Sequence, residues 1–253
     1  MAHIQHNECN YSLSSIKMMR YVINFVRDFI RTIELSSVHG FFETLRIFIV
    51  IRKVRRHTKV RIPRLKTLYR LTKKLDKLSM KGDIVEFGVW RGGSGAVLAH
   101  AAKKSPFHRT IWLFDSFKGY PAPSQKDFGT KLNTSTLKGR SKVNENKVHE
   151  LFKKMKIPKE SYKIIKGFYE DTLPRFRSPS ISLIHFDAVL YNATIISLRH
   201  LYDKVQPGGF LVFNTWEYEG TRNAVNDFFQ ERNVTLQSYD VDGVGRYFKK
   251  PLA

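Results

Sequence analysis

The chain has 253 residues, of which 44 are Lys or Arg and 22 are Asp or Glu, so its formal net charge is +22. Apolar residues make up 42% of it and aromatic residues 13%, which excludes collagen-like, low-complexity and wholly disordered classes. The single cysteine, Cys9, excludes an intramolecular disulfide and any cysteine-bound zinc or iron–sulfur site.

The first 80 residues predict a basic helical extension. Apolar residues spaced three and four apart predict a helix over residues 16–33, an evenly apolar run predicts a second over 38–54, and a leucine stripe after Pro63 predicts a third. Residues 1–82 hold 18 Lys and Arg against 5 Asp and Glu. A segment with such a charge can attract the phosphates of a membrane, a nucleic acid or a nucleotide-linked substrate. More often, however, a run of charged residues is only a helix face that contacts solvent. We expect the extension to be a lid, a dimer contact or a surface anchor.

The sequence contains no run of 18 apolar residues, so we expect no membrane-spanning helix. The expected location is the cytoplasm, with peripheral association at an anionic membrane surface as a further option.

From Asp83 onward, short apolar runs alternate with helical stretches, as in a parallel sheet flanked by helices. An Asp-Gly pair at residues 242–243 predicts a hairpin between the last two strands. Residues 120–140 lack periodicity, which predicts a surface loop that acts as a substrate or lid segment. The predicted strands are residues 83–87, 110–115, 162–166, 181–187, 209–213, 235–241 and 245–250, and the predicted helices are residues 94–104, 142–155, 194–204 and 220–232.

The sharpest motif is the glycine-rich segment 85–95 (VEFGVWRGGSG), a predicted strand that ends in a turn and opens a helix. Glycines let a ligand approach the backbone, and a helix N-terminus offers N–H groups to an anion such as a carboxylate. The Gly88-x-x-x-Gly92 spacing matches neither the dinucleotide fingerprint nor a phosphate loop, which argues against nicotinamide and ATP chemistry. Glu86, just before the turn, is placed to accept a hydrogen bond from an ammonium group. An ordinary strand-to-helix turn is the alternative.

A second carboxylate, Asp115, ends the next predicted strand. A carboxylate at the tip of the second strand is well placed to bind the hydroxyls of a ribose, although it could also cap the following helix. Together with Glu86 it predicts a ligand that carries a nucleoside.

Several ordered segments resemble the macrocin O-methyltransferase family, whose members use S-adenosylmethionine to methylate sugar hydroxyls of macrolide antibiotics and related glycosides. The segments are residues 86–94 (EFGVWRGGS), 114–123 (FDSFKGYPAP), 167–174 (GFYEDTLP), 186–194 (FDAVLYNAT), 201–210 (LYDKVQPGGF) and 245–250 (GRYFKK). The resemblance implies an α/β fold of the Rossmann-like class I methyltransferase type in residues 81–253. This fold has a seven-stranded, mostly parallel sheet with helices on both faces.

The resemblance also implies a set of cofactor-binding residues for S-adenosylmethionine. The methionine part would lie against the glycine-rich turn, the ribose against the end of the second strand, and the adenine near the segment after the third strand. The residues expected there are Glu86, Gly88, Trp90, Gly92, Ser94, Asp115, Ser116, Gly167 and Asp171.

Relatives in this family are similar in holding Mg²⁺ with one aspartate after the fourth strand and an Asp-Asp pair after the fifth. Here the first position is Asp187, but Asn214 and Thr215 stand where the pair is expected, and one carboxylate with neutral oxygens makes a weak Mg²⁺ site. Three explanations stay open. They are a weakened metal site of Asp187 completed by Asn214, Thr215 or Glu217, metal-free catalysis with Asp187 or His185 as the base, or loss of activity with ligand binding retained.

We therefore expect an S-adenosylmethionine-dependent O-methyltransferase that acts on a hydroxyl of a sugar or glycoside, with Asp187 and His185 as candidate catalytic residues. The alternative is a catalytically impaired methyltransferase-fold protein that binds the cofactor and uses its basic N-terminal region to bind a membrane surface or a partner. A nucleic-acid methyltransferase is a third hypothesis, prompted by the charge, but no nucleic-acid module is recognisable and no specific nucleic acid is expected. The expected partners are a small-molecule or saccharide acceptor, an anionic membrane surface and a second copy of the chain.

Overall fold

The computed structural model describes residues 38–128, 135–178 and 180–252, together with Arg20, Ile23, Asn24 and Arg27. The predicted helix over residues 16–33 therefore lies almost wholly outside the described residues. The chain divides into two compact units, residues 1–48 and residues 49–253, and helix α2 (Val38–Val54) crosses the division. No helix in the described part of the chain is long and apolar enough to cross a membrane.

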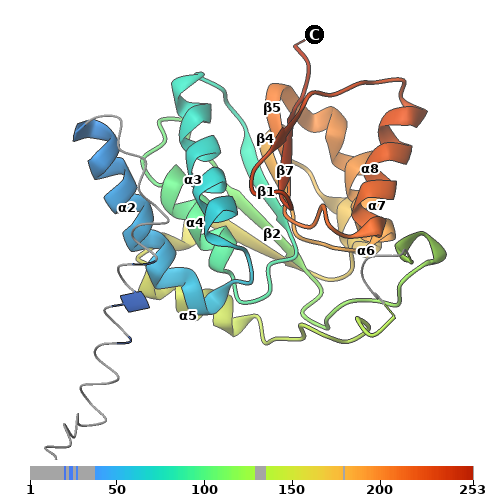
Figure 1. The fold of residues 1–253 in the computed structure, drawn as a ribbon, viewed down its shortest axis with the longest axis horizontal. Helices are drawn as coiled ribbons and strands as arrows, with labels where there is room; N and C mark the ends of the chain where they lie inside the picture. Colours follow the sequence, from blue (N-terminus) through green and yellow to red (C-terminus); the bar gives the residue numbers. More distant parts are fainter. Residues whose placement is uncertain are drawn as a thin grey trace, which may run out of the picture. The chain divides into compact units, whose positions relative to one another are not determined.

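The second unit is built on a seven-stranded sheet. Its strands are β1 (Asp83–Phe87), β2 (Ile111–Asp115), β3 (Tyr162–Lys166), β4 (Ile181–Phe186), β5 (Val205–Phe213), β6 (Ser238–Asp240) and β7 (Arg246–Lys249). They are arranged in the order β3-β2-β1-β4-β5-β7-β6 (Figure 1). Strands β1 to β5 are parallel, whereas β7 pairs antiparallel with both β5 and β6. The order reverses between β1 and β4, which creates the switch point where such sheets open a crevice.

Helices cover both faces of this sheet (Figure 1). On one face, α3 (Ile62–Lys77) packs against α4 (Gly93–Ala102), which also contacts α5 (Asn146–Lys154). On the other face lie α6 (Tyr169–Thr172), α7 (Tyr191–Leu201) and α8 (Glu219–Glu231). Short 3-10 turns cover Arg55–His57, Gln125–Asp127, Lys159–Ser161, Leu173–Arg175 and Tyr202–Lys204.

Aromatic side chains fix the carboxyl ends of the central strands. Phe87, Phe186 and Phe213 are the last residues of β1, β4 and β5, and all three are fully buried. The ring centroids of Phe186 and Phe213 are 4.5 Å apart, and those of Phe87 and Phe186 are 5.6 Å apart. Because each ring immediately precedes a residue that leaves the sheet, this packed row holds the following residues in fixed positions.

The predicted fold class is confirmed, and the differences concern the ends of some elements and one additional short helix. Strand β5 begins at Val205, four residues before the prediction. Its register against β4 shifts there, because residues 206–209 of β5, which include a Pro-Gly-Gly sequence typical of a turn, lie opposite the single residue Ser182. Strand β6 has only three residues, since it is the edge strand and pairs on one side alone. Helix α6 occupies a segment in which no helix was predicted.

The division of the chain bears on the predicted N-terminal extension, residues 1–80, whose boundary stays a prediction. The compact unit that carries the sheet begins at Ile49. Helix α3 belongs to this unit because its leucine stripe, Leu65, Leu68 and Leu75, is fully buried. The expected roles of the extension as a lid, dimer contact or surface anchor stay predictions.

Candidate active site

A cavity of about 330 Å³ opens at the carboxyl ends of the parallel strands. This volume lies in the range of roughly 300–1,000 Å³ that small-molecule sites occupy. Each parallel strand contributes the residue at its end or just after it, namely Gly88, Asp115, Gly167, Asp187 and Asn214. The cavity therefore lies at the switch point of the sheet, where α/β proteins bind their ligands.

The turn between β1 and α4 requires glycine because the backbone there passes close to the end of β4. Gly88 has φ +84°, and a Cβ atom on it would lie 2.4 Å from the backbone oxygen of Asp187. Gly92 is the left-handed N-cap of α4, with φ +82°. Ser94, in the first turn of α4, lines the cavity, whereas Gly92 shapes the turn without lining it. The first N–H groups of α4, which lack helical partners, are thus presented beside the cavity.

Trp90 forms part of the cavity wall and carries two cationic neighbours. Its backbone is left-handed, with φ +49°. The Lys59 Nζ atom lies 4.8 Å and the Arg91 Cζ atom 4.7 Å from the centroid of its ring. These cation–π contacts orient the indole at the cavity wall.

The Asp115 carboxylate holds the glycine-rich turn against the end of β2. Its Oδ2 atom accepts hydrogen bonds from the N–H groups of Val89 and Trp90, both at 2.8 Å. Its Oδ1 atom accepts one from the N–H group of Phe117 at 2.7 Å. A carboxylate has about four acceptor sites, and the described residues use three of them. One site on Oδ1 is therefore left for a ligand hydroxyl.

The remaining predicted cofactor residues divide between the cavity and the surface. Ser116 and Gly167 line the cavity. Asp171 does not, because it lies exposed on α6, while its neighbour Glu170 contributes to the lining. The short helix that the sequence did not predict thus decides which of two adjacent acids borders the cavity.

Glu86 and His185 form a buried pair outside the cavity lining. They are register partners on β1 and β4, and Glu86 Oε1 lies 2.9 Å from His185 Nδ1. Glu86 Oε2 and His185 Nε2 have no hydrogen-bond partner among the described residues. A Cβ atom on Gly95 would lie 2.6 Å from Glu86 Oε2, so this carboxylate packs under α4. Neither Glu86, a predicted cofactor contact, nor His185, a candidate base, lines the cavity, and both roles stay predictions.

The Asp187 carboxylate lines the cavity at the end of β4. The Asn214 Nδ2 group donates a hydrogen bond to its Oδ1 atom at 2.7 Å. Burial raises the pKa of Asp187 to about 6, although the electrostatic interaction with His185 and the hydrogen bond from Asn214 act in the opposite direction. A carboxyl group with this pKa is ionised at neutral pH and is more basic than an ordinary aspartate, which suits it to remove a proton.

The predicted Mg²⁺ ligands Asp187, Asn214 and Thr215 all line the cavity, but they do not fit a cation. Asn214 turns its amide nitrogen toward Asp187, while its Oδ1 atom accepts a hydrogen bond from Arg64 Nη1 at 2.8 Å. The Thr215 hydroxyl lies 3.0 Å from that of Thr221. Among the residues that the structure describes, no group of three His, Cys, Asp or Glu side chains could hold a metal ion. Mg²⁺ prefers several oxygen ligands in an octahedral arrangement, which this set does not supply.

Sequence reasoning missed Arg64, which lines the cavity and is 6% exposed. Arg64 lies at helical spacing from Leu68, Leu71 and Leu75, so it occupies the buried stripe of α3. A cation in a leucine stripe was the signal that could have drawn attention to it, because buried arginines are almost always paired.

The basic segment before α3 and the long loop after β2 also reach the cavity. Lys59 and Arg61, predicted as part of a surface charge, belong to its lining. Tyr120, at the start of the 120–140 loop, lines it as well, and residues 129–134 of that loop lie outside the described residues. Burial, with the nearby charge of Asp187, raises the pKa of Tyr120 well above its usual range, so its hydroxyl stays protonated.

Comparison with known proteins identifies relatives of this chain. It is 26% identical to the 8-demethyl-8-(2,3-dimethoxy-alpha-L-rhamnosyl)-tetracenomycin-C 4'-O-methyltransferase of Streptomyces olivaceus over 200 residues, which are 78% of this chain and 77% of that protein. It is 24% identical to the mycinamicin III 3''-O-methyltransferase of Micromonospora griseorubida over 200 residues, covering 77% of this chain and 78% of that protein.

Solved structures share the fold. The O-methyltransferase NovP superposes with a TM-score of 0.69 at 25% identity, covering 77% of this chain and 82% of its own. A calicheamicin methyltransferase matches 98% of this chain and 97% of its own with a TM-score of 0.64 at 17% identity, a likeness of fold alone.

The sequence profile of the macrocin-O-methyltransferase (TylF) family matches residues 53–250, which include α3, the whole sheet and every cavity residue described above. The protein therefore belongs to the macrocin-O-methyltransferase family and is an S-adenosylmethionine-dependent O-methyltransferase.

Proposed function

We propose that this protein transfers the methyl group of S-adenosylmethionine to a hydroxyl group of a sugar or glycoside, with Asp187 as the general base. The observation that carries the proposal is the Asp187 carboxylate, which lines the same cavity as the glycine-rich turn and has a raised pKa. The names of the relatives in Streptomyces and Micromonospora support the acceptor class, because both describe O-methylation of compounds of this kind.

The residues of the cavity fit the cofactor. The turn at Gly88 leaves no room for a side chain, and the adjoining α4 N-terminus offers N–H groups that suit a carboxylate. Asp115 keeps an acceptor site on Oδ1 that suits a ribose hydroxyl. Trp90 and Ser94 complete this part of the wall. We assign the methionine part to the α4 N-terminus and the ribose to Asp115.

Bound S-adenosylmethionine would supply an electrophilic methyl group, whose bond to sulfur breaks as the acceptor oxygen attacks, so that S-adenosylhomocysteine leaves. The acceptor proton passes to the Asp187 carboxylate. Asn214 Nδ2 holds Oδ1 of that carboxylate by a hydrogen bond of 2.7 Å, which restricts its orientation. The protonated Tyr120 hydroxyl lines the same cavity, where it can donate a hydrogen bond to the acceptor.

An acceptor screen tests the proposal. The full chain is incubated with S-adenosylmethionine and a panel of deoxyhexosides, other glycosides and nucleotide-linked sugars, and S-adenosylhomocysteine is quantified alongside the methylated product. We expect at least one saccharide to give equal amounts of the two products, with the new methyl group on oxygen. Methylation of a nitrogen or carbon acceptor, with no saccharide methylated, would overturn the proposal.

A further inference from the structure

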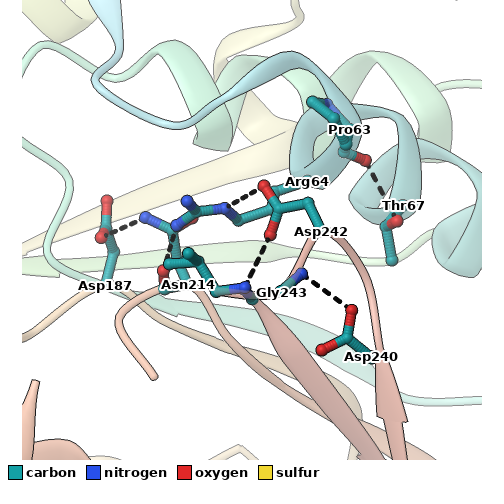
Figure 2. A network of polar contacts seen from close by, with 10 residues as sticks. Pro63, Arg64, Thr67, Asp187, Asn214, Asp240, Asp242 and Gly243 are labelled. Carbon is teal, nitrogen blue, oxygen red and sulfur yellow. Dashed lines mark hydrogen bonds and ion pairs between the residues drawn. The ribbon is translucent and has the colours of Figure 1, made fainter. Parts of the chain in front are cut away.

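The Arg64 guanidinium is a buried charge held by two separate parts of the chain (Figure 2). Its Nε atom donates to Asp242 Oδ2 at 2.9 Å in the hairpin between β6 and β7. Its Nη1 atom donates to Asn214 Oδ1 at 2.8 Å and also to the Asn214 backbone oxygen, just after β5. Arg64 on helix α3 thus places a positive charge in a fixed position beside the strand ends that border the cavity.

The hairpin is shaped around this side chain. Asp242 Oδ1 accepts hydrogen bonds from the N–H groups of Gly245 at 2.8 Å and Val244 at 3.3 Å. A Cβ atom on Gly245 would lie 2.6 Å from Arg64 Cδ, so a larger residue there would displace the arginine. Burial alone would raise the pKa of Asp242, but the Gly245 hydrogen bond and the Arg64 charge lower it, which keeps the partner carboxylate ionised.

Arg64 determines how Asn214 faces Asp187. Because a guanidinium only donates, the amide oxygen of Asn214 must point toward Arg64, and the amide nitrogen then points toward Asp187. The opposite orientation would set N–H groups against one another. A continuous chain of hydrogen bonds therefore runs from Asp242 through Arg64 and Asn214 to Asp187 (Figure 2).

The groups beside the Asp187 carboxylate, the Asn214 amide and the Arg64 guanidinium, disfavour binding of a metal ion there. A divalent cation beside Asp187 would meet an amide N–H group instead of an oxygen and would be repelled by Arg64, which carries its charge at every physiological pH. Carboxylates at positions 214 and 215, which the family resemblance led us to expect, are replaced here by Asn214 and Thr215.

We infer that Arg64 takes the place of the divalent cation in this protein, so that methyl transfer requires no metal and the positive charge behind Asp187 is built into the chain. The part of this inference that concerns the reaction rests on the proposed function, whereas the part that concerns cation binding does not. Arg64 acts through Asn214 on Asp187 and is a positioning residue.

Binding of Mn²⁺ to the full chain, followed by electron paramagnetic resonance, tests the inference without an acceptor. The wild type is expected to leave the signal of free Mn²⁺ unchanged. The variant Arg64→Gln/Asn214→Asp removes the cation and adds a carboxylate beside Asp187, so it should bind Mn²⁺ at least about tenfold more tightly than the wild type. A further Asp187→Asn change should abolish that binding.

The matched control is Arg61→Gln/Asn214→Asp, which changes the net charge by the same amount but keeps Arg64. Arg61 lines the cavity and is exposed. This control should not gain Mn²⁺ binding, because Arg64 would pair with the new carboxylate. If the unpaired Asp242 prevents folding of the Arg64→Gln variant, an added Asp242→Asn change removes that charge. Calorimetric binding of S-adenosylhomocysteine reports folding of each variant.

Two results would overturn the inference. One is wild-type binding of Mn²⁺ that Asp187→Asn removes. The other is an Arg64→Gln/Asn214→Asp variant that binds S-adenosylhomocysteine normally and gains no Mn²⁺ site. Failure of the wild type to bind S-adenosylhomocysteine contradicts the proposed function instead, and the Mn²⁺ result for the wild type still decides the inference.

Once an acceptor is known, a chelator and a small cation give a second readout. Wild-type turnover should be unaffected by EDTA. The Arg64→Ala variant should lose turnover and regain part of it when guanidinium ions are added, because the deleted side chain leaves a space lined by Asp242 and Asn214. A purely structural role would not respond to guanidinium, and loss of wild-type turnover in EDTA would contradict the inference.

Discussion

Asp187 shows how its neighbours set the chemistry of one residue. Burial raises its pKa to about 6, while the electrostatic interaction with His185 and the hydrogen bond from Asn214 limit the rise. The buried Glu86–His185 pair, with its 2.9 Å contact, does not line the cavity, but its two members shift the pKa of Asp187 in opposite directions. A weaker acid at this position makes a stronger base once it is ionised.

The raised pKa of Asp187 predicts a pH dependence of methyl transfer. A general base must be unprotonated, so kcat/KM should be constant above pH 7 and should fall tenfold per pH unit below the pKa of about 6. Initial rates measured across pH 5–9 in buffers of constant ionic strength check this expectation. A profile that stays flat down to pH 5 would contradict the assignment of Asp187 as the base.

Removal of the base should lower turnover and leave cofactor binding intact. We expect Asp187→Asn to reduce kcat by about 10²–10⁴-fold, the usual contribution of general base catalysis. Asp171→Asn is the matched control, since this acid is exposed and lies outside the cavity lining. Methyl-transfer assays of both variants, with S-adenosylhomocysteine affinity measured in parallel, distinguish loss of the base from loss of the fold. Equal rates for the two variants would remove Asp187 from the mechanism.

Residue positions could be predicted for the side chains that end or directly follow a strand. Asp115 and Asp187 each end or follow an apolar run, which places them at the ligand edge of a parallel sheet. Glu86 and His185 could not be placed in this way, because their pairing depends on the register of β1 against β4. A sequence gives the alternation along one strand but not which residues of two strands lie side by side.

At the level of elements, replacing a glycine can cost stability in two ways: through the strain of a left-handed backbone and through a clash of the new Cβ atom. Gly88 in the β1–α4 turn and Gly139 in the loop after β2 separate the two effects. Gly88 and Gly139 have similar backbone angles, φ +84° and +75°, but only Gly88 is crowded. A Cβ atom there would lie 2.4 Å from the Asp187 backbone oxygen, whereas nothing lies within 4 Å at Gly139.

We therefore expect Gly139→Ala to cost about 1–2 kcal/mol of unfolding free energy, the penalty of the left-handed conformation alone. Gly88→Ala should cost clearly more, because the backbone at Asp187 must also shift. Urea unfolding of the two variants and the wild type measures the difference. Equal losses would mean that the close approach of β1 and β4 does not constrain the turn.

Two of the parallel strands were the most predictable elements. Strands β1 and β3 have the predicted bounds, and each is followed directly by a glycine, Gly88 or Gly167. The ends of β5 and β6 depend on tertiary contacts, namely the register shift between β4 and β5 and the exposed edge of the sheet. Those contacts cannot be predicted from the local sequence alone.

For the whole molecule, the alternation of strands and helices predicted a parallel sheet flanked by helices, and the family resemblance implied its seven strands. The N-terminal part was less predictable. Its charge pattern suggested a surface, yet Lys59, Arg61 and Arg64 border the cavity. A sequence shows that charges are dense in a segment, but only the packing of α3 shows which of them turn inward.

Binding of the reaction product should stabilise the whole chain. At a concentration of S-adenosylhomocysteine 100 times its Kd, linkage adds about 2.7 kcal/mol to the unfolding free energy, which corresponds to roughly 5–10 °C in Tm for a chain of this size. Mg²⁺ at millimolar concentration should add nothing, because Arg64 and Asn214 disfavour a cation beside Asp187 and the described part of the chain holds no group of three His, Cys, Asp or Glu side chains for a metal ion. Differential scanning fluorimetry with each ligand checks both expectations. A rise in Tm with Mg²⁺ that Asp187→Asn removes would contradict the account.

Binding of the methyltransferase cofactor in the switch-point cavity is tested most directly by a calorimetric titration with S-adenosylhomocysteine. We predict one site in the wild type, an affinity at least about tenfold weaker in Asp115→Ala, because a hydrogen bond to a charged group is lost, and an unchanged affinity in Asp171→Ala. Absence of binding to the wild type, or binding that Asp115→Ala does not weaken, would contradict the claim.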